Sequence, residues 1–300
     1  MSGGKVLEIE YYAVSDIGRT RANHEDIFYL PTGDFVKENE VNKENRQVFY
    51  KGKLTDKSAD FKCFAVADGM GGHNAGEVAS GIIADMLNKH AGGCRTVADF
   101  EKLADRINMT VFEAGQSDKA RLNLGSTLAA AIISGNKIYS VNVGDSRVYL
   151  YGAPGLKRLS HDHTEGQLLI DIGVIKSEKD DLYKARSSLT RFIGMNTSET
   201  AGLSYVSDGY GIESFSLCML CSDGLTSFVG DDKIEEILSV YLNAPLDEIG
   251  VRLLKEAFDT SLNDRAGSDN ITLILLKPVF AEDNSGGRRG FLSRLFKKDK

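Results

Sequence analysis

The sequence contains little cysteine and no long apolar segment. No run of 18 or more apolar residues occurs among its 300 residues, which excludes a membrane-spanning helix. Four cysteines are too few for a disulfide scaffold. Residues 1–5 (MSGGK) lack the apolar stretch of a secretory signal. We therefore expect an intracellular, cytoplasmic protein.

Two of the cysteines, Cys218 and Cys221, form a C-x-x-C pattern. A zinc site needs four ligands, and neither Cys63 nor Cys94 supplies a second close pair. In a strand, positions i and i+3 point to opposite faces. The interpretation is that Cys218 and Cys221 are buried apolar residues rather than metal ligands or a redox pair.

Composition and charge are those of a globular protein. Apolar residues make up 42% and charged residues 26%, and at roughly 100–200 residues per domain the chain forms one large or two small domains. The formal charge is −7, but residues 288–300 carry +5, so the remaining chain sums to −12. An acidic body argues against nucleic acid as a partner and is compatible with carboxylates that bind metal cations.

Helical and strand patterns alternate in blocks along the chain. Strands are expected at 8–14, 63–67, 126–133, 137–143, 147–151 and 271–276, and helices over 78–87, 100–111, 234–242 and 246–258. Gly135 and Asn136 form a tight turn, so the strands on either side of it form an antiparallel hairpin. Blocks of hairpin-linked strands and paired helices predict antiparallel sheets with helices on their outer faces.

Three segments differ from these blocks. Residues 33–62 are rich in Lys, Glu, Asn and Asp and are expected to form a polar hairpin or loop inserted in the domain. Residues 160–200 lack a regular period and are expected to form a flap. Residues 281–287 resemble a linker to a basic tail. These patterns predict a globular domain over 1–278, followed by a linker and tail over 279–300.

Acidic residues recur where apolar strands end. Asp68 and Asp223 each follow a short apolar strand and precede a glycine, and Asp145 lies in a turn between two strands. Asp269 precedes the last strand, and Glu25 with Asp26 precedes a strand near the N-terminus. Carboxylate and carbonyl oxygens suit Mg²⁺ and Mn²⁺, so these sites predict a metal-binding cradle. Asp-Gly is also a common turn, and the pattern alone does not define an activity.

Eight segments over roughly residues 10–277 stand out in order along the chain: SDIGRTRANHED, FAVADGMGGHNAGEVAS, LGSTLAAAII, YSVNVGDSRVYLY, LSHDHT, LTRFIGM, LCSDGL and GSDNITLILL. In content and order they resemble the metal-dependent Ser/Thr protein phosphatase family (PPM, or type 2C) in its bacterial form. The resemblance implies an α+β fold in which two packed antiparallel sheets are flanked by helices on both outer faces.

The resemblance also implies a site for two Mg²⁺ or Mn²⁺ ions. By the matching motifs, Asp68 bridges the two ions, and Asp223 and Asp269 complete the shell of one of them. The carbonyl oxygen of Gly69 joins the second ion. Two such cations share a water, lower its pKa and present it to phosphorus. The implied reaction is direct attack by a metal-bridging water, without a phosphoenzyme.

Four further residues match positions with roles in the family. Asp26 matches a residue that holds the waters of the second ion, with Glu25 as an alternative or helper. Asp145 matches the position that often binds a weaker third ion. Arg21 matches the arginine that binds the substrate phosphate, for which a planar guanidinium is well suited.

The leading hypothesis is therefore a phosphatase for phosphoserine and phosphothreonine in proteins, which opposes a bacterial Ser/Thr kinase. The alternatives are a pseudophosphatase that binds phosphoproteins without turnover, and a phosphohydrolase of small phosphate esters. Phe291, Leu292, Leu295 and Phe296 have helical spacing among the basic residues of the tail. Residues 288–300 therefore form either a solvated tail or a segment that contacts an anionic membrane surface or a protein partner.

Overall fold

The computed structural model describes residues 5–37, 39–56, 61–71, 75–117, 124–197, 202–262 and 269–282. Its strands are β1 (Lys5–Asp16), β2 (Asp26–Tyr29), β3 (Gln47–Asp56), β4 (Lys62–Met70), β5 (Gly125–Ser126), β6 (Leu128–Ser134), β7 (Lys137–Val143), β8 (Arg147–Gly152), β9 (Gly155–Arg158), β10 (Tyr205–Val206), β11 (Tyr210–Gly211), β12 (Leu217–Cys221) and β13 (Ile271–Glu282). Its α-helices are α1 (Ala75–His90), α2 (Val97–Ser117), α3 (Glu165–Asp171), α4 (Asp181–Lys184), α5 (Asp223–Thr226), α6 (Asp231–Tyr241) and α7 (Leu246–Ser261). Short 3₁₀ turns occur at Ala91–Gly93 and Ile212–Ser214.

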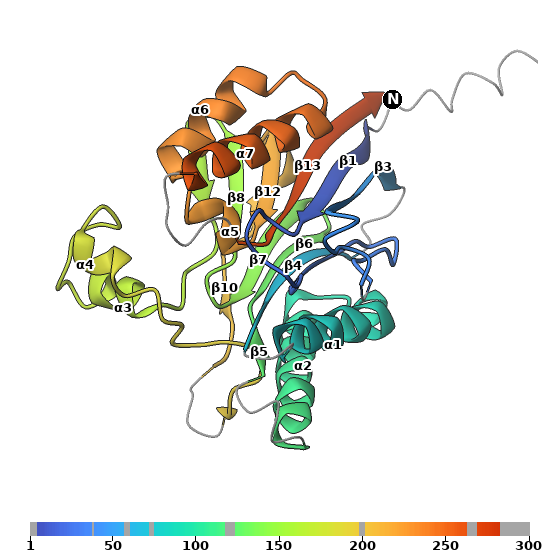
Figure 1. The fold of residues 1–300 in the computed structure, drawn as a ribbon. Helices are drawn as coiled ribbons and strands as arrows, with labels where there is room; N and C mark the ends of the chain where they lie inside the picture. The colour runs from blue at the N-terminus through green and yellow to red at the C-terminus, as the bar shows by residue number, and fades with distance from the viewer. Residues whose placement is uncertain are drawn as a thin grey trace, which may run out of the picture.

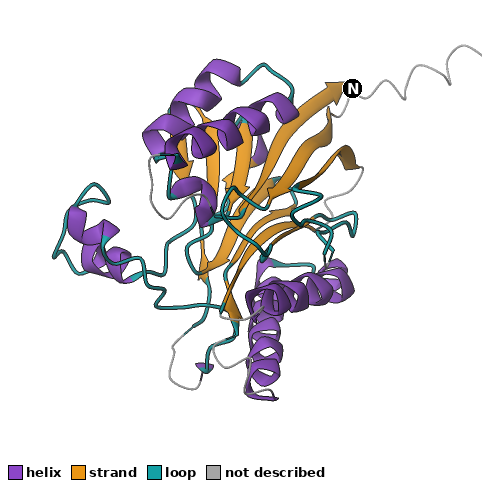
Figure 2. Cartoon of the chain, viewed as in Figure 1, coloured by secondary structure: helices purple, strands orange, loops and turns teal. Residues whose placement is uncertain are grey.

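The strands form two sheets that pack face to face (Figure 1). The first sheet has the order β3-β1-β13-β12-β8-β9, and the second has the order β10-β7-β6-β4-β2. Every strand pair in them is antiparallel. Helices α5, α6 and α7 cover the outer face of the first sheet, and α1 with α2 covers the second (Figure 2). The predicted two-sheet sandwich with helices on both outer faces is confirmed.

Alternation along the strands explains why both faces of the first sheet are buried. In β1, Tyr11 and Ala13 face the core between the sheets, whereas Tyr12 and Val14 face the core beneath α5–α7. Cys218 and Cys221 of β12 divide in the same way between the two cores, and both are free thiols. Successive side chains in a strand point to opposite faces. A strand that is covered by helices on one face and by the second sheet on the other is therefore apolar throughout. The expectation that both cysteines are buried apolar residues is confirmed.

The expectation of a polar hairpin or loop over 33–62 is wrong for β3. This strand pairs along its whole length with β1 and forms one edge of the first sheet. Its residues Val48, Tyr50 and Leu54 alternate toward the core, while Lys51 and Lys53 face outward. Lysines are common on edge strands because they prevent pairing with another chain. In β3, Lys51 and Lys53 make the segment polar in composition and hide the alternation of its apolar residues.

The flap and the C-terminus also depart from the regular layers. The flap, residues 160–200, is described as far as residue 197, and its helices α3 and α4 project from the sheets (Figure 1). Strand β13 continues to Glu282, so the start of the predicted linker belongs to the sheet instead. The tail, residues 288–300, lies outside the described residues. Within the described part of the chain, no helix is long and apolar enough to cross a membrane.

Candidate metal-dependent active site

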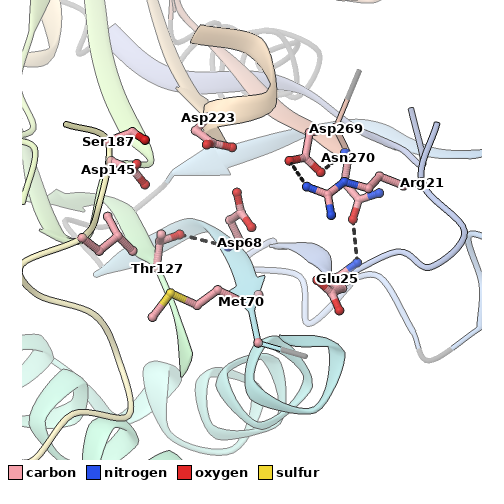
Figure 3. Close-up of a pocket in the computed structure, with 13 residues that line it drawn as sticks. Arg21, Glu25, Asp68, Met70, Thr127, Asp145, Ser187, Asp223, Asp269 and Asn270 are labelled. Atoms are coloured by element: carbon pink, nitrogen blue, oxygen red, sulfur yellow. Dashed lines mark hydrogen bonds and ion pairs between the residues drawn. The ribbon is translucent and has the colours of Figure 1, made fainter. Parts of the chain in front are cut away.

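A pocket of about 310 Å³ opens where several strands end, and acidic residues line it (Figure 3). Five carboxylates reach it from distant parts of the chain: Glu25, Asp68, Asp145, Asp223 and Asp269. The backbone of Gly69 and the side chain of Arg21 also line it. The structure therefore brings together every candidate site residue except Asp26.

Two of the acids lie next to glycines that the packing requires. A Cβ atom on Gly69 would lie 2.2 Å from the carbonyl oxygen of Gly76 in α1. A Cβ atom on Gly224 would lie 1.9 Å from the carbonyl oxygen of Asn270. Any side chain at either position would force neighbouring backbone apart. The Asp-Gly pairs thus let separate segments approach closely enough to place their carboxylates in one pocket.

Buried hydroxyl groups fix the backbone of Asp68 and connect it to the Asp145 turn. The N–H of Asp68 donates to Thr127 Oγ1 at 2.9 Å, and its carbonyl oxygen accepts from Ser126 Oγ at 2.8 Å. Thr127 Oγ1 in turn lies 2.7 Å from Ser146 Oγ, next to Asp145. Each of these hydroxyls is buried and hydrogen-bonded. Together they fix the backbone at Asp68 relative to the Asp145 turn.

Asp26 lies directly behind the pocket. It is the register partner of Asp68 across β2 and β4, and it is buried. Its carboxylate accepts a hydrogen bond from Ser222 Oγ at 2.7 Å. It lines a second cavity, of about 690 Å³, on the other side of the residue 22–26 segment. Glu25, and not Asp26, is the acid of this pair that faces the first pocket.

The acids of the site raise one another's pKa values. Burial, followed by the charges of Asp26 and Asp223, raises the pKa of Asp68 well above its usual value. Burial is the largest cause for Asp145 as well, and the charge of Asp223 adds to it. The pKa of Asp26 rises to about 7, through burial and then through Asp269 and Asp223. Carboxylates this close and this buried are costly to ionise without a cation.

Arg21 is the one basic side chain among the described residues that line the pocket. Its Nη2 lies 2.6 Å from Oδ2 of Asp269, and both side chains are partly exposed. Asn270 supports the same edge, because its Oδ1 accepts from the backbone N–H of Glu25 at 2.8 Å. Across the described ranges, no three carboxylate, imidazole or thiol groups are gathered as they would be around a single metal ion.

Several supporting residues were not identified from the sequence. Ser146, Ser222 and Asn270 each adjoin a predicted acid, so their position beside the motifs was a usable signal. Thr127 lies 59 residues from Asp68, to which it hydrogen-bonds, and only the pairing of the strands brings them together.

Comparison with known proteins agrees with this geometry. The sequence model of the family Protein phosphatase 2C matches residues 33–167. The Serine/threonine phosphatase stp of Listeria monocytogenes serotype 4b is 32% identical over 222 residues, which cover 71% of this chain and 82% of that protein. The chain belongs to the protein phosphatase 2C family.

Solved structures extend the similarity across the phosphatase domain. The crystal structure of the Mycobacterium tuberculosis serine/threonine phosphatase PstP/Ppp has a TM-score of 0.67 and 28% identity, and covers 91% of this chain and 98% of its own. A structure of the PstP catalytic domain in complex with two manganese ions has a TM-score of 0.65 and 27% identity, with 91% and 99% coverage. The fold predicted for a type 2C phosphatase is thus shared over most of the chain.

Proposed function

We propose that this chain is a Mn²⁺- or Mg²⁺-dependent phosphatase that hydrolyses phosphoserine and phosphothreonine in proteins. The observation that carries the proposal is the convergence of five carboxylates and one arginine in a single pocket. A phosphoprotein phosphatase needs a cradle for cations and a cationic group for phosphate, and the pocket contains both. Membership of the type 2C family and the two manganese ions of the PstP structure support the same activity.

The donor groups of the pocket are of the kind that divalent cations bind, although no three carboxylates of the described residues surround one point. Asp68 and Asp223 are half-buried acids, and Arg21 is the only base among the described residues that line the pocket. Carboxylate and carbonyl oxygens are the ligands that Mg²⁺ and Mn²⁺ prefer. We infer that Asp68 would bridge both ions, with Asp223 and Asp269 on one and the Gly69 carbonyl on the other.

The remaining acids complete this assignment. Glu25 and Asp26 would lie beside the second ion, and Asp145 would hold a weaker third ion. Glu25 faces the pocket and Asp26 supports it from behind through Ser222. When bound, such cations supply a water that is acidic at neutral pH and stabilise negative charge on phosphate.

The protein's own groups then bind and orient the substrate. Arg21 would hold two oxygens of the phosphate through its guanidinium. It leaves Asp269 for this role at little cost, because an exposed ion pair contributes at most about 1 kcal/mol. The Thr127 hydroxyl already bonds the N–H of Asp68 and the hydroxyl of Ser146, so it is not placed to attack phosphorus. The proposed reaction is direct attack by water, without a phosphoenzyme, as in the family's implied mechanism.

The proposed activity also suggests which enzyme phosphorylates the substrates and where the protein acts. We propose that the substrates are phosphorylated by a bacterial Ser/Thr kinase and that the protein acts in the cytoplasm. Contact of residues 288–300 with a membrane surface or a protein partner remains a proposal, since those residues are not described. A phosphoprotein-binding pseudophosphatase would be expected to lack part of the acid set, and none of the predicted acids is missing.

The test is hydrolysis of p-nitrophenyl phosphate and a phosphothreonine peptide by the purified chain. We expect release of phosphate with Mn²⁺ or Mg²⁺ and none with excess EDTA. Asp68→Ala and Asp223→Ala should lower kcat by a factor on the order of 10³. Asp232→Ala is the matched control, because Asp232 is an exposed acid that does not line the pocket. A folded, metal-binding wild type that hydrolyses neither substrate would support the pseudophosphatase instead.

A further inference from the structure

The flap is attached to the sheets at both of its ends through buried contacts. At its start, Asp162 accepts bonds from Arg147 Nε at 3.0 Å and Nη2 at 2.6 Å. At its end, the buried side chain of Asn108 in α2 accepts from the backbone N–H of Gly194 at 2.8 Å and donates to Met195. Asp162 and Asn108 are both buried, so both ends of the flap are fixed to the body of the protein.

A third attachment holds the middle of the flap. Glu178 lies between α3 and α4. One of its carboxylate oxygens accepts a hydrogen bond from Arg147 Nη2 at 3.2 Å, and the other accepts one from Arg158 Nη2. Tyr183 of α4 adds its hydroxyl, 3.4 Å from the same Arg147 nitrogen. Arg147 and Arg158 belong to β8 and β9 of the first sheet, so Glu178 joins the flap to the edge of that sheet.

The Glu178 attachment differs from the other two in its exposure. The side chain of Glu178 is 31% exposed and that of Arg158 is 21% exposed, whereas Asp162 is 2% exposed. Partly exposed ion pairs are screened by salt and exchange with water more readily than buried ones. The middle of the flap is therefore the part whose attachment opens first.

The chain that follows Glu178 reaches the active-site pocket. After α4 it continues to Ser187 and Leu189, which line the pocket, with Ser187 on the side away from Arg21 and Glu25 (Figure 3). Leu189 then forms a bridge with Thr164 at the start of α3. Backbone hydrogen bonds also join the wall to the start of α3, from Glu165 N–H to Ser188 O at 3.0 Å and from Gly166 N–H to Arg186 O at 2.8 Å. Helices α3 and α4 and the wall therefore form one unit between the fixed ends, and Glu178 holds that unit to the first sheet.

We propose that Glu178 is a positioning residue for the phosphopeptide. It holds the Ser187–Leu189 wall against the part of the substrate that extends beyond the phosphate. This inference rests on the proposed phosphatase function. It also separates two kinds of substrate: a peptide that contacts the wall depends on Glu178, whereas a small phosphate ester that occupies only the metal cradle does not.

The chain supplies a matched control beside Glu178. Lys179 pairs with Asp232 of α6 at 2.8 Å, but both side chains are more than 80% exposed. It lies in the same part of the flap and also links it to the body. Lys179→Ala therefore tests whether loss of any ion pair in this part of the flap changes peptide KM. Glu178→Ala tests the contact to Arg147 and Arg158.

The experiment compares Glu178→Ala, Glu178→Gln and Lys179→Ala with wild type at saturating Mn²⁺. For Glu178→Ala we expect a KM for a phosphothreonine peptide at least five-fold higher, with kcat within two-fold of wild type. Hydrolysis of p-nitrophenyl phosphate should change by less than two-fold. Glu178→Gln should be intermediate and Lys179→Ala should match wild type. Amide hydrogen exchange should rise over residues 165–190 in Glu178→Ala alone.

Two results would overturn the proposal. One is a Glu178→Ala variant that matches Lys179→Ala in peptide KM and in exchange. The other is an equal loss of kcat with both substrates together with a lower Tm, which would mean that Glu178 only supports the fold. If wild type hydrolyses neither substrate, the proposed function fails. Phosphopeptide affinity and hydrogen exchange then decide the role of Glu178 by the same comparison.

Discussion

Replacing Asp26 with asparagine should stabilise the metal-free protein. Asp26 is buried, no base among the described residues forms an ion pair with it, and its pKa of about 7 stands above the usual 3.8. A shift of about 3 units corresponds to about 4 kcal/mol of destabilisation once the carboxylate is ionised in the folded state. Asparagine has the same shape and can still accept the bond from Ser222, but its buried N–H₂ costs about 1–3 kcal/mol. The expected net gain in unfolding free energy is therefore about 1–3 kcal/mol at pH 8.

The pH dependence distinguishes this cause from ordinary repacking. Because the folded pKa is raised, the unfolded chain loses its proton first, and stability falls as the pH rises from 3.8 to about 7. At pH 5 most of the cost in wild type is absent, so the advantage of Asp26→Asn should shrink by about 3 kcal/mol relative to pH 8. The exposed Asp232→Asn serves as a control without such an advantage.

The assay is urea denaturation in EDTA at pH 5 and pH 8, repeated with Mn²⁺. With Mn²⁺, wild type should gain stability by mass action and the variant should gain less. The reasoning is refuted if wild type is at least as stable as Asp26→Asn in EDTA at pH 8. It is also refuted if the difference between them does not change with pH.

Two further predictions concern the supports of the site. Burial lowers the pKa of His163 to about 4, and its Nδ1 accepts from the N–H of Gly144 at 3.1 Å. A depressed folded pKa means that stability falls as the pH drops from 6.5 toward 4, by up to about 3 kcal/mol, and denaturation of His163→Gln should lose that part of the pH dependence. Arg147→Met leaves Asp162 buried without its main partner, so unfolding free energy should fall by about 3–5 kcal/mol. A fall below 1 kcal/mol in a denaturant titration would show that Arg158 alone satisfies Asp162.

The acids of the site could be predicted from the sequence because each lies at the end of an apolar strand. In antiparallel sheets the end of one strand lies beside the start of its neighbour, so Asp223 after β12 lies beside Asp269 before β13. Asp68, near the end of β4, meets them at the same side of the sandwich. Strand β3 could not be predicted in the same way. Its lysines mask the alternation of Val48, Tyr50 and Leu54, and its partner β1 lies more than 30 residues away. Edge strands carry less apolar signal than central ones.

The contacts between distant segments could not be predicted from the sequence either. Thr127 is an unremarkable threonine in the β5–β6 region until strand pairing brings it to Asp68. Glu178 lies in a segment of mixed charge, and nothing local distinguishes it from Lys179 or its neighbours. Short-range patterns report which residues belong to a helix or strand. They do not report which buried hydroxyl or carboxylate each side chain will meet.

Burial and mutual repulsion make the acid cluster costly to ionise in the metal-free fold. Burial is the largest cause of the raised pKa of Asp26, and the charges of Asp269 and Asp223 add to it. Burial is also the first cause of the raised pKa values of Asp68 and Asp145, and neighbouring carboxylates are the second. A cation in the cluster would favour the ionised carboxylates and offset part of this cost. Hydrogen bonds among Ser126, Thr127, Ser146 and the backbone of Asp68 hold these turns in place, so the carboxylates cannot separate without breaking buried hydrogen bonds.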